Sequence, residues 1–177
     1  MRVSLVPVSL PRSHMLIRLR RTAPLAAALA ILSTIGIDTA VIAAPTPASQ
    51  VRTYDKNLLK YVNHARTSRG GTVLKQSNRL YKIALKWAKY EAAHSDFDHN
   101  PNYPSQLAAA CPNWRAYGEN TGWQNGTNAK ALFKLYMSDT IHRGNILNPS
   151  FKDVGIATVK SKDGREWNVM DFASHCA

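Results

Sequence analysis

Two strand-like segments near the end of the sequence constrain the fold most. Residues 154–160 and 166–172 are rich in β-branched and aromatic side chains, and Ser161-Lys162-Asp163-Gly164 joins them. An Asp-Gly pair between two such segments is a strong signal for a tight turn. The sequence therefore predicts an antiparallel β-hairpin here.

Three helices are predicted upstream of this hairpin. Residues 54–67 and 78–94 both place apolar side chains on one helical face, and Ser77 is a suitable N-cap for the second helix. A third helix is predicted over about 128–138. Helices followed by a hairpin predict a mixed α+β fold, with helices packed on an antiparallel sheet.

Residues 95–128 have no sustained hydrophobic period and are rich in Asn, Pro, Gly and Asp. The sequence therefore predicts a long loop region between the second and third helices. A loop of that length inside a compact domain is usually functional or disordered. We accordingly look for functional side chains in it.

The first 44 residues differ from the rest and are predicted to be a secretory signal peptide. They contain a cluster of three arginines, an apolar run over 23–37, and small residues at Ala43-Ala44 where a peptidase can cut. Met15 directly precedes the basic cluster and is a candidate true start. The apolar run is too short to span a membrane comfortably, so no transmembrane helix is expected in the mature protein.

After the signal, residues 45–53 are predicted to be an exposed leader segment and residues 54–177 a single domain. The predicted localisation is secreted, extracellular. The part after residue 44 carries 18 basic and 10 acidic side chains, a net charge of +8. That balance favours anionic surroundings such as cell-wall polymers or lipid head groups, although a solvated basic surface is the commoner explanation. Nucleic acid is not expected as a partner, because no recognition motif accompanies the basic residues.

Cys111 and Cys176 both lie in the exported part. An even pair in an oxidising compartment is most simply a disulfide. A metal site built on two isolated thiols is not expected, because zinc-thiolate sites usually show paired short spacings.

Several short motifs follow one another in the sequence: Asn63-His-Ala-Arg66, Phe97-Asp-His99, Gly118-Glu119-Asn120, the run from His142 to Pro149, and Asp171-Phe172. In order and spacing they resemble the motifs of the CAP superfamily, which covers cysteine-rich secretory proteins, antigen 5 and plant pathogenesis-related proteins. The chain is most similar to its bacterial SCP-domain branch. The resemblance implies an α-β-α sandwich and covers nearly all of residues 54–172.

The resemblance also implies a cleft that holds two histidines and two acidic residues. Three of these carry over directly to His99, Glu119 and His142. For the fourth, Asp139 follows Tyr136 by three residues, where family members have an acid after a helix Trp. The side chain of Asp139 is one methylene shorter than that of glutamate. Two roles therefore stay open for Asp139: it replaces the second acid of the cleft, or it simply begins a turn. Trp114 and Trp123 are expected to flank Glu119 as cleft walls.

Two neutral imidazoles, His99 and His142, can hold a divalent metal such as zinc at about 2.0–2.1 Å, with Glu119 as a ligand or as the group that orients a bound water. The alternative is a hydrogen-bonded polar cluster that stabilises the loop. No organic cofactor is expected.

The function predicted is that of a secreted binding or interaction module whose ligand lies in the cell envelope or outside the cell. One alternative is a metal-assisted hydrolase of peptides or cell-wall material, with Glu119 as the candidate catalytic base. Another, implied only by the resemblance, is lipid or sterol binding. Two histidines and two carboxylates do not by themselves predict an enzyme.

Overall fold

The computed structural model describes residues 47–176, with side chains described from Thr53 onward. The predicted signal peptide and the candidate start at Met15 lie outside the described residues. In chain order the elements are α1 (Pro47–Thr67), β1 (Lys75–Gln76), α2 (Asn78–His94), α3 (Tyr103–Ala110), β2 (Tyr117–Asn125), α4 (Ala129–Ser138), α5 (Thr140–Leu147), β3 (Asp153–Lys160) and β4 (Arg165–Ala173). Within this part of the chain, no helix is both long and apolar enough to cross a membrane.

The strands form one sheet in the order β1-β3-β4-β2. Strands β3 and β4 are antiparallel, which confirms the predicted hairpin, and β2 pairs antiparallel with β4 along its whole length. The two-residue strand β1 adds a short parallel pairing to β3, so the sheet is mixed. Strand β2 is therefore an edge strand, with a neighbour on one side only.

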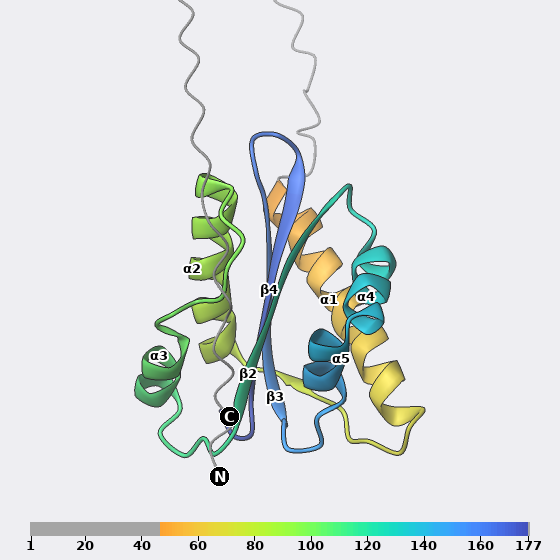
Figure 1. Ribbon diagram of the computed structural model, residues 1–177, viewed down its shortest axis with the longest axis vertical. Coiled ribbons are helices and arrows are strands. Elements are labelled where there is room, and N and C mark those ends of the chain that lie inside the picture. Colours follow the sequence, from red (N-terminus) through yellow and green to blue (C-terminus); the bar gives the residue numbers. More distant parts are fainter. Residues whose placement is uncertain (1–46, 177) are drawn as a thin grey trace, which may run out of the picture. The chain divides into compact units, whose positions relative to one another are not determined.

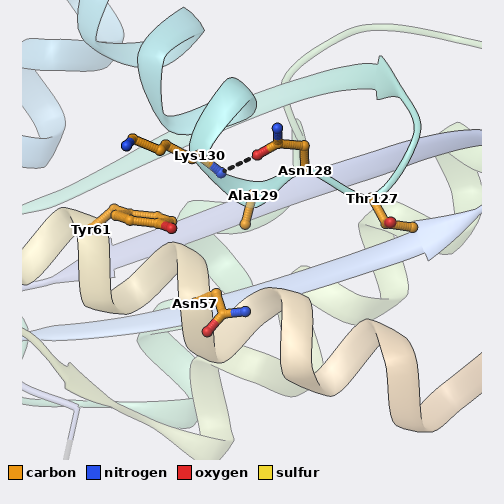
Figure 2. Close-up of a pocket in the computed structure, with 6 residues that line it drawn as sticks. All are labelled: Asn57, Tyr61, Thr127, Asn128, Ala129 and Lys130. Atoms are coloured by element: carbon orange, nitrogen blue, oxygen red, sulfur yellow. Dashed lines mark hydrogen bonds between the residues drawn. The ribbon is translucent and has the colours of Figure 1, made fainter.

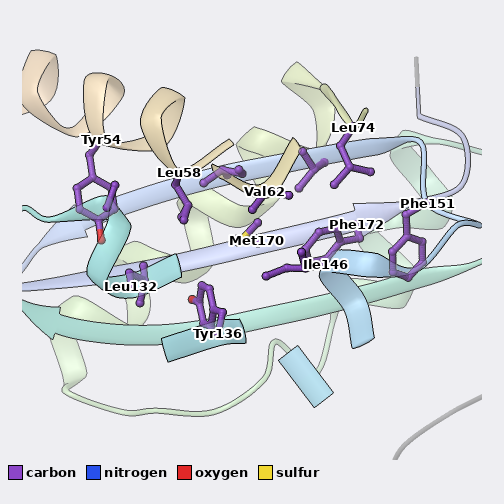
Figure 3. Packing of buried hydrophobic residues seen from close by; sticks show 13 residues of the cluster. Tyr54, Leu58, Val62, Leu74, Leu132, Tyr136, Ile146, Phe151, Met170 and Phe172 are labelled. Atoms are coloured by element: carbon purple, nitrogen blue, oxygen red, sulfur yellow. The ribbon is translucent and has the colours of Figure 1, made fainter. Parts of the chain in front are cut away.

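Helices cover both faces of the sheet, with α2 and α3 on one face and α1, α4 and α5 on the other (Figure 1). This arrangement confirms the expected α-β-α sandwich. Side chains alternate between the two faces along β4, as in any strand. Met170 and Phe172 pack with residues of α1, α4 and α5, as Figure 3 shows, whereas Val169 packs with the α2 residues Ala84 and Ala88.

Helix α2 lies directly on the sheet at Gly155 of β3. A Cβ atom at this position would lie 2.2 Å from the Leu80 carbonyl carbon and 2.3 Å from the Tyr81 nitrogen. Both atoms are backbone, so no side chain can rotate away to make room. The absence of a side chain at residue 155 therefore sets the distance between α2 and the sheet.

The guanidinium of Arg66, at the end of α1, is buried and bonds only to backbone carbonyls. Its Nε donates to Thr72 O at 2.6 Å, and Nη1 donates to Ile146 O and Asn148 O, each at 2.8 Å. Nη2 donates to Phe151 O at 3.1 Å. These bonds join α1 to the end of α5 and to the segment that leads into β3.

The predicted disulfide between Cys111 and Cys176 is formed. Ser77, the predicted N-cap of α2, accepts a hydrogen bond from Leu80 N and donates one to Cys176 O at 2.9 Å. The segment after β4 is thus fixed to the start of α2 as well as to the end of α3.

Two predictions about element boundaries are corrected. Helix α1 begins at Pro47 rather than Tyr54, so most of the predicted leader segment 45–53 is helical. Proline at a first helical position gives up no hydrogen bond, so its presence is compatible with this start. The predicted loop 95–128 contains α3 and β2, and a further helix, α5, follows α4. Both corrections arise in polar or short segments, where hydrophobic periodicity is weak.

A Gly155→Ala substitution is expected to lower the free energy of unfolding by about 3 kcal/mol, because the new methyl group would overlap the α2 backbone. Urea unfolding followed by circular dichroism measures the change. Gly144→Ala is the matched control, since a Cβ atom there meets nothing within 4 Å. Residue 144 lies inside α5, so the control should be neutral or slightly stabilising. Equal stability of the two variants would contradict the close contact.

Candidate functional site

The four predicted cleft residues form two pairs. His99 lies in the loop after α2 and Glu119 on β2, whereas Asp139 and His142 lie at the start of α5. Glu119 shares a face of β2 with Thr121, whose hydroxyl donates to Glu91 of α2, so Glu119 points toward the α2 layer. Helix α5 belongs to the opposite layer (Figure 1). The pairs therefore come from opposite sides of the sheet and approach each other around its β2 edge.

In the first pair, the Glu119 carboxylate holds the His99 ring. Its Oε1 accepts from His99 Nδ1 at 2.7 Å and from Asn100 N at 2.9 Å. Glu119 is buried, whereas half of the His99 side chain is exposed. The hydrogen bond from Glu119 raises the pKa of His99, against the opposing effect of partial burial. The exposed ring is thus oriented from behind by a buried carboxylate.

Two further carboxyl groups lie behind Glu119, and sequence reasoning did not assign either to the site. Asp171 is the cross-strand neighbour of Glu119 and is fully buried. Burial, followed by the charge of Glu119, raises the pKa of Asp171 well above its ordinary value. A proton on Asp171 avoids placing a second negative charge beside Glu119 in the interior.

Glu91 of α2 is the second buried carboxyl group. Burial raises its pKa from the ordinary value of 4.5 to about 8, and the charge of Glu119 contributes to the rise. Glu91 accepts a hydrogen bond from Thr121, but its second oxygen has no partner among the described residues. A polar residue on the apolar side of the predicted second helix was the available signal, since Glu91 lies one turn after Trp87 and Ala88.

In the second pair, Asp139 caps α5 and also contacts His142. Its Oδ1 accepts from the backbone N–H groups of Ile141 and His142, each at 2.9 Å, and lies 2.9 Å from His142 Nδ1. Asp139 therefore begins helix α5, which agrees with the predicted role at the start of a turn. It also pairs with His142. Burial lowers the pKa of His142, and Asp139 offsets part of this effect.

Side-chain amides hold α5 against β2. Asn120 Nδ2 donates to His142 O at 3.0 Å, and Asn145 Nδ2 donates to Glu119 O at 3.0 Å and to Asn120 Oδ1 at 2.8 Å. These bonds fix the start of α5, and therefore the His142 backbone, relative to Glu119. The charge of His99 also lowers the pKa of His142, so the two rings lie within electrostatic range of each other.

A pocket of about 240 Å³ opens at the β2 edge. It is lined by side chains from the α2–α3 loop, β2, α4 and α5: Phe97, Thr121, Gly122, Trp123, Leu132, Leu135, Tyr136, Asp139 and His142. The pocket thus includes Asp139 and His142 of the predicted cleft, while His99 and Glu119 are not part of its lining. Trp123 lines it as expected. Trp114 instead packs edge-on against Tyr117, away from the pocket.

A second pocket, of about 320 Å³, lies between α1 and the start of α4 (Figure 2). Its lining is mostly polar: Asn57, Tyr61, Thr127, Asn128, Ala129 and Lys130. It contains no histidine or carboxylate. We therefore take the pocket at the β2 edge as the candidate site, although it is the smaller of the two.

The donor set fits a metal ion only in part. Nδ1 of each histidine faces a carboxylate, which is how ligating histidines are commonly oriented, and each ring keeps one further nitrogen. However, the Thr121 backbone lies beside the His142 ring and raises its pKa. Within residues 53–176, no group of three or more His, Cys, Asp or Glu side chains is arranged to hold a metal ion. Two imidazoles alone supply fewer protein ligands than ordinary zinc sites have.

Residues 59–172 match the sequence profile of the cysteine-rich secretory protein family, CAP. The chain therefore belongs to this family. The Bacillus subtilis protein YkwD is 29% identical over 117 residues, which are 64% of this chain and 45% of YkwD. The chain thus spans less than half the length of that relative.

Several solved structures share the fold. A cysteine-rich secretory protein from Staphylococcus aureus has a TM-score of 0.59 at 22% identity, covering 72% of this chain and 40% of that one. An extracellular SCP-domain protein from Bacillus anthracis has a TM-score of 0.61 at 18% identity, covering 72% and 43%. An outer surface protein from Borrelia burgdorferi has a TM-score of 0.64 at 14% identity, covering 71% and 95%. At these identities the likeness shows a common fold.

Stability is expected to fall as the pH rises from about 4.5 to about 8, because folded Glu91 keeps a proton that it loses in the unfolded chain. Glu91→Gln, which cannot ionise, should reduce that fall by on the order of 3 kcal/mol. Thermal unfolding at several pH values measures it. The raised pKa values of Asp55 and Asp171 act in the same direction, so part of the fall should remain.

Asp163→Asn is the matched control for this experiment, because its carboxylate lies exposed in the turn between β3 and β4. It should leave the fall in stability between these pH values as it is in the wild type. A Glu91→Gln protein with the wild-type pH profile would show that Glu91 is ionised in the fold.

Proposed function

We propose that this protein is a secreted binding module whose cleft at the β2 edge takes a ligand in the cell envelope or outside the cell. The supporting observation is the apolar surface at the pocket. Phe97, Trp123 and Leu135 are 54%, 41% and 54% exposed, although all three are large and apolar. Exposed apolar side chains gathered at one site commonly mark a binding surface.

Further support comes from the structural relatives, the predicted signal peptide and the net charge. Two of the structural relatives are described as secretory or extracellular proteins and one as an outer surface protein. The predicted signal peptide agrees with an extracellular role. The net charge of +8 after residue 44 favours anionic surroundings, which include cell-wall polymers.

We further propose that His99 and His142 hold a divalent metal, zinc first among the candidates, through the ring nitrogens that do not face carboxylates. The ion would supply a fixed positive charge beside the pocket. Burial keeps His142 neutral at neutral pH, the form that coordinates.

Hydrolysis with Glu119 as general base is not proposed, because Glu119 already accepts two hydrogen bonds and does not line the pocket. Its contacts make it the group that orients His99. Lipid binding is not proposed either, since only the family resemblance implies it.

The binding proposal is tested by co-sedimentation of residues 45–177 with purified Bacillus subtilis cell walls, in enough salt to screen the net charge. The wild type should sediment with the walls. A Phe97→Ser, Leu135→Ser double variant should bind about tenfold more weakly, because both apolar contacts are lost. Val73→Ser is the control, as Val73 is equally exposed but lies outside the pocket. Absent wall binding, or equal binding by all three proteins, would contradict the proposal.

The metal proposal is tested by calorimetry with zinc on metal-free protein. Binding should be lost in a His99→Ala, His142→Ala double variant and retained in His64→Ala, whose ring is exposed on α1. It should also weaken below about pH 6, where imidazoles become protonated. Equal zinc affinity in the double variant and the wild type would place any metal elsewhere.

A further inference from the structure

The outer edge of β2 presents unpaired backbone groups at the candidate site. The hydrogen bond from Ser174 N to Ala116 O shows that even-numbered residues of this strand face β4. Because the direction alternates along an antiparallel strand, the N–H and C=O groups of Glu119, Thr121 and Trp123 point away from the sheet. The bond from Asn145 to Glu119 O, made from the α5 side, agrees with this direction.

Helix α5 closes only part of this edge. Asn145 Nδ2 donates a hydrogen bond to Glu119 O, and the His142 ring lies beside the Thr121 backbone. Beyond that point, neither Trp123 N–H nor Trp123 C=O has an outward hydrogen-bond partner within residues 53–176. An edge strand with free backbone groups is a template for pairing with another extended chain.

The pocket lies along this open stretch and receives walls from both sides of the sheet. Phe97 follows α2, in one layer, and Leu135 belongs to α4, in the other. Between Thr121 and Trp123, residue 122 is a glycine. A Cβ atom there would lie only 3.0 Å from the Tyr136 ring, so the glycine lets this ring pack closely against β2. A strand docked here would direct successive side chains alternately toward the Phe97 side and the Leu135 side.

We propose that the open edge of β2 at Trp123 binds an extended peptide segment of another protein as an additional β-strand. The inference rests on the proposed function, since it names the class of ligand for the same cleft. Backbone groups of the peptide pair with Trp123, and apolar side chains at alternate positions contact Phe97 and Leu135. This division of roles between backbone and side chains is how sheets bind added strands.

Charge favours a peptide over a second copy of this chain. Two copies would each bring a net charge of +8 from the part after residue 44, whereas a neutral or acidic peptide meets no such repulsion. The partner segment is therefore expected to be extended, to alternate apolar with small polar residues, and to carry no net positive charge.

The test uses a set of synthetic acetylated heptapeptides with threonine at alternate positions, varied apolar residues between them, and a glutamate at each end. Titrations are followed by the amide NMR signals of the ¹⁵N-labelled protein, residues 45–177. The best peptide should bind more tightly than about 1 mM and slow hydrogen exchange at the Trp123 amide about tenfold.

Backbone pairing is isolated by N-methylation of that peptide. A copy methylated at alternate amides along one edge should bind about tenfold more weakly, and a copy methylated along the other edge should bind like the parent. Leu135→Asp should weaken binding similarly, whereas Val73→Asp should not. Equal binding by both methylated copies, or an unprotected Trp123 amide, would overturn the proposal.

If no peptide binds below about 1 mM, this inference is wrong, and retained wall binding would show that the proposed function survives it. Analytical ultracentrifugation of the protein without peptide tests whether the chain associates with itself. Self-association that protects the Trp123 amide would assign the edge to a second copy and overturn the peptide assignment.

Discussion

The buried guanidinium of Arg66 holds backbone carbonyls from the end of α5 and from the segment that follows it. A guanidinium has five donors in a rigid plane, so it can satisfy several converging carbonyls that no neutral side chain could. Burial lowers the pKa of Arg66, and it has no carboxylate partner among the described residues. The position of α5, and with it His142, therefore depends on a charge contributed by α1.

The site follows from the way that α5 meets the sheet. Strand β2 carries polar and glycine residues where a central strand would carry β-branched ones, and its amides and carboxylates bond outward to α5 and to the loop after α2. An edge strand tolerates this composition because only one side of its backbone is paired. Because only one side of the β2 backbone is paired, part of its edge also stays open beside an apolar pocket. The edge position of β2 therefore explains both where the site lies and which polar groups it contains.

Sequence patterns predicted the elements that have a clear period and signal residues. The hairpin around Asp163-Gly164 and helix α2 with its Ser77 cap were found in this way. Strand β2 was missed because its sequence does not alternate apolar and polar residues. Its buried residues 119–122 lie on both faces and are Glu, Asn, Thr and Gly. The residues of the site were named from the family resemblance, but their pairing was not. The carboxyl groups of Glu91 and Asp171 became part of it only through contacts across the sheet.

The buried carboxyl groups of Glu91 and Asp171 also change how the molecule behaves in an electric field. A count of side chains after residue 44 gives a net charge of +8, with every acid taken as ionised. A pKa raised to about 8 keeps Glu91 mostly protonated at neutral pH, and burial also raises the pKa of Asp171, so the folded protein carries fewer negative charges than this count. The folded domain should elute later from a cation exchanger than its composition indicates, and it should meet an anionic surface with more positive charge than its unfolded chain would carry.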